Sequence, residues 1–305
     1  MRRRRSALLL LAFIAGRADV AVLRAADAAD ASYQGKPVSH WQRQLSAATP
    51  QDRWNATIAL GETGPAASAA IPALTAAFKD KDERVQAGAA AALAKIGKPA
   101  VPALIELARK GDRRQRRWAL YALGRSASPE AFPVLIEAMN DRVDDVREKA
   151  AEGLHRAGLD GPDAVRIFSA AMKDTNSAVR FWAAFGLGDA GVPSGVPALT
   201  AALQDENKNV RAISCESLGK LGPASRAAVP ALIERLQDDP YVQNFSILAL
   251  GGIGPGAAAA LSHLERLAEQ SESRRVRHNA AWSIARIRGE DPGEPPTPPA
   301  KRPAP

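Results

Sequence analysis

The most reactive side chains of this sequence, four histidines and one cysteine, do not form a set that could do chemistry. The histidines are His40, His155, His263 and His278. None has a second histidine or a cysteine at the spacing that places two metal ligands on one helix face. A glycine-rich phosphate loop and a Ser, His and Asp set are also absent. The sequence therefore predicts no catalytic residue, no metal and no cofactor, and we expect a protein that is not an enzyme.

Basic side chains form a second candidate site, because they could contact nucleic-acid phosphates. They are Arg109, Lys110, Arg113, Arg114, Arg116 and Arg117, with Arg274, Arg275 and Arg277 further along. Acidic side chains lie on the same predicted edge between these two groups: Asp141, Asp144, Asp145, Asp174, Asp205, Glu206, Asp238 and Asp239. Because acid interrupts the basic stripe, the pattern favours a solvated charged rim over nucleic-acid binding.

Aromatic side chains are the third and sharpest candidate. Eight of the fifteen Phe, Trp and Tyr residues recur at equivalent places in a sequence repeat: Trp54, Trp118, Tyr121, Phe181, Trp182, Phe185, Phe245 and Trp282. Ile58 and Leu248 share their register. These positions point away from the buried stripe of their helices, so we expect them on the concave face of the fold. An exposed apolar patch of this kind is typical of an interaction site.

Two features complicate this aromatic stripe. Charged side chains interrupt it and could orient a partner: Glu148, Lys149, Glu152 and Glu216. One position of the repeat could instead face sideways and pack between adjacent units: Trp118, Trp182 and Phe245. The sequence leaves both interpretations open for that position and favours exposure for Tyr121, Phe185 and Trp282.

The repeat that positions these residues occurs seven times between Ile71 and Ile284, with an eroded first copy from Trp41 to Leu60. Its leucine column is Leu60, Leu93, Leu123, Leu154, Leu187, Leu218, Leu250 and Ile284. Four residues earlier stand Ala56, Ala89, Ala119, Ala150, Ala183, Ser214, Ser246 and Ala280. Eight residues earlier stand Val85, Val146, Val179, Val210, Val242 and Val276. This spacing predicts a helix with one buried stripe, whose small residues let a neighbouring backbone come close.

A second helix lies upstream in each copy. Its first turn contains a proline, as at Pro72, Pro102, Pro133, Pro197 and Pro230. Glycines end the other helix at Gly64, Gly97, Gly158, Gly191, Gly222 and Gly254, where we expect positive φ. Neither helix can bury its apolar stripe alone, so the units must stack. We predict an all-α fold, an α-α superhelix of about eight two-helix units over residues 33–288, helical without strands from Val38 to Arg288.

These columns resemble the HEAT repeat, particularly the short bacterial type named after phycobilisome lyases. The resemblance also rests on turn aspartates Asp80, Asp141, Asp174 and Asp205, followed six residues later by Gln86, Arg147, Arg180 and Arg211. In that family the aspartates and arginines form a ladder between units, which the resemblance implies here. The departures are Lys110, in place of an aspartate, and Gln86 and Gln243, in place of arginines.

The resemblance also raises enzymes as an alternative. HEAT-like repeats build deoxyhypusine hydroxylases, whose iron ligands come as His-Glu pairs, and that dipeptide does not occur in this chain. The phycobilisome-lyase type raises attachment of a bilin to a partner's cysteine. A shared solenoid says little about either activity, because the same fold hosts many functions.

The two ends of the chain differ from the repeats. Four arginines after Met1 and an apolar run from Ala7 to Ala15 are typical of a signal peptide, predicted as residues 1–28 with cleavage at Ala28 or Ala31. The run is too short to span a bilayer, and no other membrane span is expected. Arg17 and Asp19 follow it closely, which leaves open a mis-assigned start or an uncleaved tail.

Removal of residues 1–28 takes six basic and two acidic side chains, and reduces the formal charge from +8 to +4. The only cysteine, Cys215, allows no intramolecular disulfide and is expected in the core. Residues 289–305 contain seven prolines and no larger apolar side chain, which predicts a disordered tether that favours polyproline II.

Together these patterns predict an exported, monomeric, non-enzymatic scaffold in the bacterial periplasm or outside the cell. It would bind a protein or peptide along its concave aromatic face. A lyase- or hydroxylase-related enzyme is the alternative, and nucleic-acid binding through the arginine-rich edge is the third hypothesis.

Overall fold

The protein is described by a computed structural model over residues 32–126 and 128–297. The predicted signal peptide and the last eight residues of the proline-rich tail lie outside the described residues. The chain divides into two compact units, Met1–Ala131 (unit 1) and Phe132–Pro305 (unit 2).

The described part of unit 1 begins with a hairpin of β1 (Ser32–Tyr33) and β2 (Lys36–Pro37), which pairs Tyr33 with Lys36. Its turn residues Gln34 and Gly35 have φ of 52° and 71°, as a two-residue hairpin turn requires. The remaining elements are α2 (Val38–Gln44), α3 (Pro50–Thr63), η1 (Gly64–Ala70), α4 (Ile71–Ala76), η2 (Ala77–Lys79), α5 (Glu83–Ile96), η3 (Lys98–Ala100), α6 (Val101–Lys110), α7 (Arg113–Arg125) and η4 (Pro129–Ala131).

All the regular elements among the described residues of unit 2 are helices. Its elements are α8 (Phe132–Ala138), α9 (Asp144–Arg156), α10 (Gly161–Ala171), α11 (Ser177–Asp189), η5 (Pro193–Gly195), α12 (Val196–Ala202), α13 (Lys208–Leu221), η6 (Gly222–Ala228), α14 (Val229–Arg235), α15 (Pro240–Ile253), η7 (Gly254–Ala260), α16 (Leu261–Gln270) and α17 (Arg274–Arg288). With unit 1, the described residues contain eight helix pairs, the number that the repeat predicts. The prediction of no strands from Val38 onward is confirmed for those residues, since the hairpin precedes Val38.

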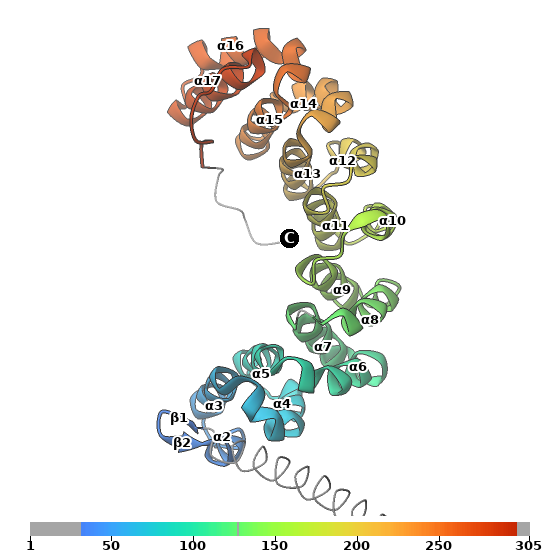
Figure 1. Cartoon of the computed structure of the whole chain (residues 1–305), viewed down its shortest axis with the longest axis vertical. Helices are drawn as coiled ribbons and strands as arrows, with labels where there is room; N and C mark the ends of the chain where they lie inside the picture. Colours follow the sequence, from blue (N-terminus) through green and yellow to red (C-terminus); the bar gives the residue numbers. More distant parts are fainter. Residues whose placement is uncertain (1–31, 127, 298–305) are drawn as a thin grey trace, which may run out of the picture. The chain divides into compact units, whose positions relative to one another are not determined.

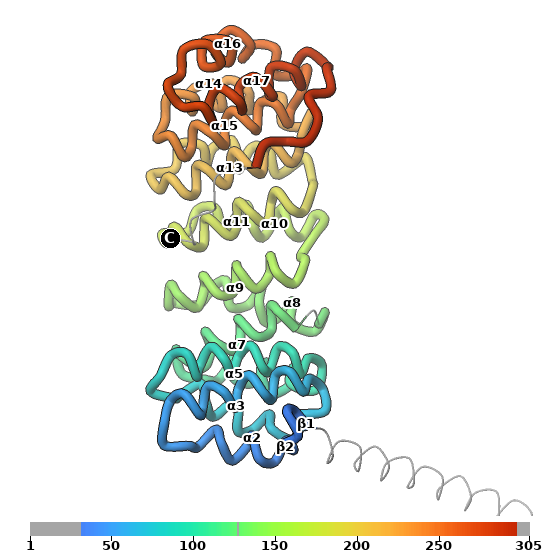
Figure 2. Tube along the Cα trace, turned by 90° about the vertical axis from the view of Figure 1, so that its left-hand side faces the viewer, coloured from blue at the N-terminus to red at the C-terminus, as the bar shows by residue number. Residues whose placement is uncertain are grey.

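Each unit has two layers of helices, seen in Figures 1 and 2. The second helices of successive pairs lie side by side in one layer, and the first helices form the other. In unit 1 the second-helix layer consists of α3, α5 and α7, and in unit 2 of α9, α11, α13, α15 and α17. Small residues let these helices approach: a Cβ on Gly219 of α13 would lie 2.9 Å from the Ala249 Cα of α15. We call the solvent side of this layer the second-helix face.

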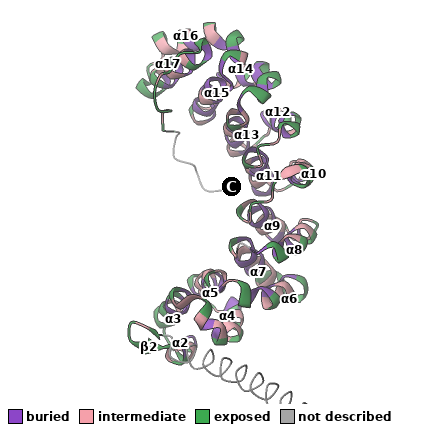
Figure 3. Cartoon of the chain, in the orientation of Figure 1, coloured by how far each residue is buried: buried purple, intermediate pink, exposed green. Residues whose placement is uncertain are grey.

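The core lies between the two layers, as Figure 3 shows for each unit. All predicted valines and leucines of the two apolar columns are buried, and the most exposed of them, Ile284, has 9% relative exposure. Ser246 is buried in the small-residue column, but its hydroxyl is not left without a hydrogen bond, because it donates to the Leu232 carbonyl at 2.6 Å. All six predicted helix-ending glycines have positive φ, from 59° to 77°.

One helical stretch, Pro240–Gln270, is long and apolar enough to cross a membrane by composition. It contains α15, η7 and α16, and 56% of its apolar window is buried inside the structure. A bent pair, Glu83–Ile96 with Lys98–Lys110, passes the same test but turns by 116°. Their apolar side chains serve the helix-to-helix packing of the repeats.

Candidate functional site

The aromatic stripe is less exposed than the sequence predicts. Trp118, Phe181 and Phe245 are buried. For Trp118 and Phe245 this is the packing between units that the sequence left open, whereas for Phe181 the expectation of an open apolar face is wrong. The cause is the close approach of the second helices, which draws rings at their flanks into the contact; the Trp118 indole donates across to Gln86 of α5 at 2.9 Å. The other five aromatics are half-buried: Trp54, Tyr121, Trp182, Phe185 and Trp282.

In unit 1 the partly accessible rings come with arginines. Tyr121 packs edge to face on Trp118 with ring centroids 5.7 Å apart. The Arg117 guanidinium lies 4.6 Å from the Trp118 ring centroid and that of Arg125 lies 5.5 Å from the Tyr121 ring. These distances are within the range of cation–π contacts. Trp54, on α3, lies beside Gly88 of α5, where a Cβ would meet its ring at 3.3 Å.

In unit 2 three rings from two helices form one stacked surface. His155 of α9 stacks on Phe185 of α11 with centroids 4.3 Å apart and an interplanar angle of 26°. Trp182 lies nearly parallel to both, 5.5 Å from His155 and 6.0 Å from Phe185. We call these rings, with the charged side chains around them on α9, α11 and α13, the α9–α13 cluster.

Cations border these stacked rings. Lys220 of α13 places its ammonium 4.7 Å from the Phe185 ring centroid and 2.7 Å from the Asp189 carboxylate. That carboxylate also lies 3.6 Å from His155 Nδ1, and Arg156 lies 5.4 Å from the Trp182 centroid. Because each of these cations lies over a ring and beside a carboxylate, the face is amphipathic instead of purely apolar.

A buried carboxylate anchors the α9 side of the cluster. Glu152 accepts from Lys149 at 2.7 Å and from Arg156 at 2.8 Å, with 7% of its side chain exposed. Burial alone would raise the pKa of Glu152, but the two cations outweigh it and hold that pKa below its usual range. Burial likewise opposes the charge of Lys149, yet Glu152 and Glu148 raise its pKa. The interruption of the aromatic stripe in the sequence is therefore an internally paired ion network.

His155 belongs to this site, although sequence reasoning did not select it. The residue after the leucine column is glycine in five of the eight copies: Gly61, Gly124, Gly188, Gly219 and Gly251. At Gly188 a Cβ would lie 2.6 Å from the Ser217 Cβ of the next second helix. The fourth copy has His155 there, and its ring turns onto α11. The replacement of glycine by histidine in this column was the sequence signal that could have identified His155 as a site residue.

The implied arginine–aspartate ladder is present in unit 2. The Arg180 guanidinium donates two hydrogen bonds to the Asp205 carboxylate of the next pair, at 2.7 and 2.9 Å, an arrangement that we call a fork. Its third nitrogen donates to the Asp174 carbonyl of its own pair at 2.9 Å. Arg147 makes the same contacts with Asp174 and the Asp141 carbonyl. The predicted ladder is confirmed, with carboxylates supplied by the following pair and carbonyls by the same pair.

Two members of the ladder, Asp238 and Arg53, were not predicted. The predicted Arg211 makes two bonds to Asp238, at 2.8 and 2.7 Å, and Arg53 of unit 1 makes two bonds to Asp80, at 2.6 and 2.9 Å. Burial disfavours the charge of Asp238, but bonds from Arg211 outweigh it and hold the pKa of that carboxyl below its usual range. Arg53 occupies the same register as Arg211, one residue after the valine column, which the sequence shows.

The basic cluster lies along the turn between α6 and α7. Arg113 and Arg114 are exposed, whereas Arg117 contacts Glu83 at 2.7 Å and Arg116 donates to the Gly111 carbonyl. In unit 2, Arg277 donates to the Ser271 carbonyl at 2.6 Å. Several of these arginines thus take part in the packing of the repeats.

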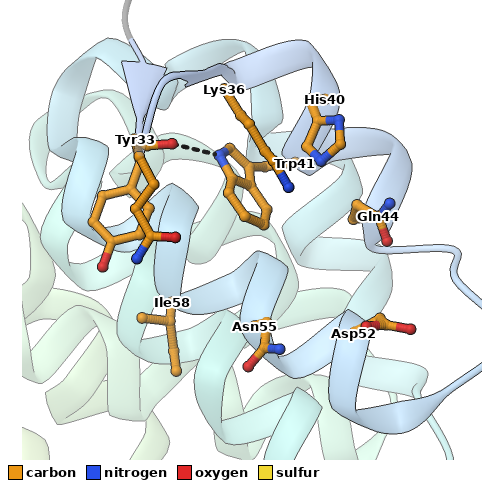
Figure 4. Close-up of a pocket in the computed structure, with 9 residues that line it drawn as sticks. Tyr33, Lys36, His40, Trp41, Gln44, Asp52, Asn55 and Ile58 are labelled. Carbon is orange, nitrogen blue, oxygen red and sulfur yellow. Dashed lines mark hydrogen bonds between the residues drawn. The ribbon is translucent and has the colours of Figure 1, made fainter.

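A pocket of about 410 Å³ lies at the start of unit 1, between the hairpin, α2 and α3 (Figure 4). The Trp41 indole donates to the Tyr33 carbonyl at 3.3 Å, and the Lys36 ammonium lies 5.2 Å from its ring centroid. Asn55 and Ile58 of α3 form the opposite wall. Ile58 is the one large apolar side chain that is exposed among the described residues.

Within residues 32–126 and 128–297, no three His, Cys, Asp or Glu side chains are arranged to hold a metal ion. Cys215 is buried, and that burial raises the pKa of its thiol, as the expected core position implies.

Comparison with known proteins agrees with this architecture. The sequence matches the HEAT repeats family over residues 38–124, 101–176, 164–244 and 229–295, and the chain belongs to that family. The fold is similar to that of the karyopherin Kap121p bound to the extreme C-terminus of the protein phosphatase Cdc14p. The TM-score is 0.66 at 15% identity, over 83% of this chain and 34% of that one.

Two enzymes are also similar to the chain. Deoxyhypusine hydroxylase of Rattus norvegicus is 33% identical over 88 residues, which are 28% of this chain and 28% of the hydroxylase. The match therefore spans less than a third of that enzyme. The complex of CpcE and CpcF of phycocyanin lyase from Nostoc sp. PCC7120 has a TM-score of 0.44 at 22% identity, over 82% of this chain and 94% of that one.

Proposed function

We propose that this HEAT-repeat chain is a non-enzymatic scaffold that binds a protein or peptide on its second-helix faces, chiefly on unit 2. The α9–α13 cluster carries the proposal, because it presents stacked His155, Trp182 and Phe185 rings bordered by cations and carboxylates. Aromatic and arginine side chains concentrate binding energy at protein interfaces. Rings already held in place also lose little conformational freedom when a partner binds.

The pairing of the cluster's charges supports an extended polar partner. Lys220 and Arg156 each contact both a ring and a carboxylate, so they can turn toward a partner's acceptor without leaving a buried charge alone. The karyopherin of similar fold is bound to the extreme C-terminus of another protein. On this chain we propose that a peptide lies along α9, α11 and α13, against the stacked rings.

We also propose export to the bacterial envelope or the exterior, and a monomeric state. Support comes from the basic and then apolar sequence of residues 2–15 and the small residues at Ala26 to Ala31. Sequencing of the mature N-terminus should begin near Ala29 or Ser32. An intact Met1 on protein recovered from cytoplasm would contradict export.

The binding proposal can be tested with peptides selected from a random display library on the immobilised chain. We expect Phe185→Leu, which keeps apolar volume but removes the stacked ring, to weaken a selected peptide about 30-fold, the factor that about 2 kcal/mol implies. Phe132→Leu is the matched control, since Phe132 is half-buried on α8 in the first-helix layer. Equal affinities for Phe185→Leu and the unchanged chain, with both folded by thermal melting, would contradict the proposal.

A further inference from the structure

The pocket at the hairpin of unit 1 changes in character from one end to the other, as Figure 4 shows. One wall is a face of α3, where Asp52, Asn55 and Ile58 follow one another at intervals of three residues. Ile58 shares one end of the pocket with Tyr33 of the hairpin, and Asp52 shares the other end with Gln44 of α2. The pocket therefore has an apolar end and a polar end, with the Asn55 amide between them.

Trp41 and Lys36 form the wall opposite α3. The Trp41 and Tyr33 rings meet edge to face with centroids 6.2 Å apart, which extends the apolar end of the pocket. The Lys36 ammonium lies 5.2 Å from the Trp41 ring centroid and forms no ion pair with any described residue. A ring face attracts a cation but leaves most of its hydrogen-bond donors available. Lys36 can therefore bind an anionic group in the pocket.

The α3 wall also keeps polar atoms available. Asp52 accepts from the Thr49 hydroxyl through Oδ2 at 2.6 Å, and Asn55 accepts from Gln51 through Oδ1 at 3.0 Å. Within residues 32–126 and 128–297, the other Asp52 oxygen and the Asn55 amide nitrogen make no hydrogen bond, and Asp52 makes no ion pair. The pocket thus offers a negative acceptor and a neutral donor on one wall and a cation on the other.

We propose that this pocket binds a zwitterion with a large apolar group: an apolar α-amino acid or a very short peptide of such residues. Lys36 and Asn55 bind its carboxylate, Asp52 binds its ammonium group, and the apolar side chain lies between Tyr33 and Ile58. The volume of about 410 Å³ is near the lower end of the range for ligand pockets, about 300 to 1,000 Å³, and suits a molecule of this size. The site lies on unit 1 and is independent of the binding function proposed for unit 2.

Other classes of ligand fit this pocket less well. A sugar packs on an open ring face, but Trp41 is only 8% exposed, Lys36 lies over its ring, and its indole already donates to the Tyr33 carbonyl. A phosphate would meet the Asp52 carboxylate, and a metal ion would meet the Lys36 ammonium. A purely apolar ligand would take both charges out of water without replacing their hydrogen bonds. A ligand with both charges complements both side chains.

The test titrates the full chain with L-phenylalanine, followed by saturation-transfer difference NMR. At the usual affinity per atom, a ligand of about twelve non-hydrogen atoms has a dissociation constant of about 1 mM. Phenylalaninamide lacks the carboxylate, and N-acetylphenylalanine lacks the ammonium group. Each should bind about fivefold more weakly than phenylalanine, the factor for one partly exposed ion pair.

Two variants assign each charge of the ligand to one side chain. Lys36→Gln should weaken phenylalanine about fivefold but leave phenylalaninamide unchanged, because that ligand has no carboxylate. Asp52→Asn should weaken phenylalanine by about the same factor and leave N-acetylphenylalanine unchanged; the new amide can still accept from the Thr49 hydroxyl. Lys98→Gln, at an exposed lysine of unit 1 outside the pocket, is the matched control. Melting temperatures check that every variant folds.

No binding of phenylalanine at about 20 mM, well above the expected dissociation constant, would overturn the proposal. A loss in Lys36→Gln or Asp52→Asn that is equal for all three ligands would also overturn it, since such a loss comes from the shape of the pocket and not from a charge pair. Phenylalanyl-phenylalanine distinguishes the two sources of the zwitterion. Tighter binding than phenylalanine assigns the pocket to short peptides, and weaker binding assigns it to free amino acids.

Discussion

Unit 2 links its helix pairs through three consecutive arginine forks, whereas unit 1 has one fork followed by a neutral substitute. In unit 2, Arg147, Arg180 and Arg211 each bind the carboxylate of the next pair. In unit 1, the fork of Arg53 on Asp80 is followed by Gln86. Gln86 donates to the Asp80 carbonyl at 2.6 Å and accepts from the Trp118 indole at 2.9 Å.

The comparison shows that one register can connect repeats by two kinds of chemistry. A fork supplies two charge-assisted bonds and ties the stability of each pair to the charge of an aspartate. The Gln86–Trp118 bond also connects neighbouring helix pairs, but it contains no titrating group. It uses an aromatic side chain that the sequence assigned to the binding face. We therefore expect unit 2 to depend strongly on its arginines and unit 1 to depend partly on an indole.

The largest expected effect is that of Arg180→Ala in unit 2. The guanidinium and the Asp205 carboxylate are each about 9% exposed. Truncation removes both guanidinium bonds from that mostly buried carboxylate, which keeps a bond from the Asn207 amide, and removes the arginine donor to the Asp174 carbonyl. We expect a loss of about 3 kcal/mol, which is roughly 10 °C in melting temperature for a unit of this size. Arg113→Ala, at an exposed arginine, is the control and should change melting little. Similar drops for both would show that the ladder has no special role.

Arg53→Ala should lower melting less than Arg180→Ala. Arg53 makes the same fork, but 16% of its side chain is exposed, against 9% for Arg180, and it connects the first pair of the chain. Water can replace more of its lost bonds there. Differential scanning calorimetry of the two variants side by side measures the difference, and a larger drop for Arg53→Ala would reverse the ranking of the units.

The pH dependence of stability should follow the forks. Bonds from Arg211 hold the pKa of Asp238 below its usual range despite burial, and Arg147 does the same for Asp174. Because these folded-state pKa values are depressed, the unfolded chain binds more protons in acid. The stabilisation is complete above about pH 4, the ordinary aspartate value, and is lost as pH falls through the folded values. Thermal melting from pH 6 to 2.5 should be flatter for Arg211→Ala than for the unchanged chain; parallel curves would contradict this.

The smallest effect is expected for Trp118→Phe in unit 1. The change keeps the ring in its buried place but removes the bond to Gln86, leaving that amide oxygen without its donor. We expect a loss of about 1 kcal/mol. A double-mutant cycle with Gln86→Leu isolates the bond, and its coupling energy should be close to the whole effect. A coupling energy near zero would mean that Trp118 stabilises unit 1 by packing alone.

Much of the fold could be predicted from the sequence, because each column of the repeat is supported by several independent copies. The valine, leucine and small-residue columns fix the buried stripe, and glycines such as Gly97 and Gly222 mark the positive φ that ends each second helix. The position of the ladder arginines could also be predicted from the sequence. Arg53 and Asp238 were missed only because their copies of the repeat depart from the turn aspartate column.

The face was harder to predict, because exposure depends on the distance between neighbouring helices, which a single helix pattern does not contain. Glycines after the leucine column bring the second helices together, so rings such as Phe181 and Phe245 end up buried between them. The His155 stack needed the converse inference, that the one copy with a large ring in that column would send it onto the next helix. The contact between Trp282 and Gly293 joins a helix to the tail, and the sequence repeat does not predict it, because the tail lies outside the repeat.

The central claim, that the second-helix face of unit 2 binds a peptide, is tested most directly by hydrogen–deuterium exchange with and without a display-selected peptide. We predict slower exchange in segments from α9, α11 and α13 around His155, Phe185 and Lys220, with the first helices α10 and α12 unchanged. Protection confined to the first-helix layer, or to the basic turn between α6 and α7, would contradict the claim.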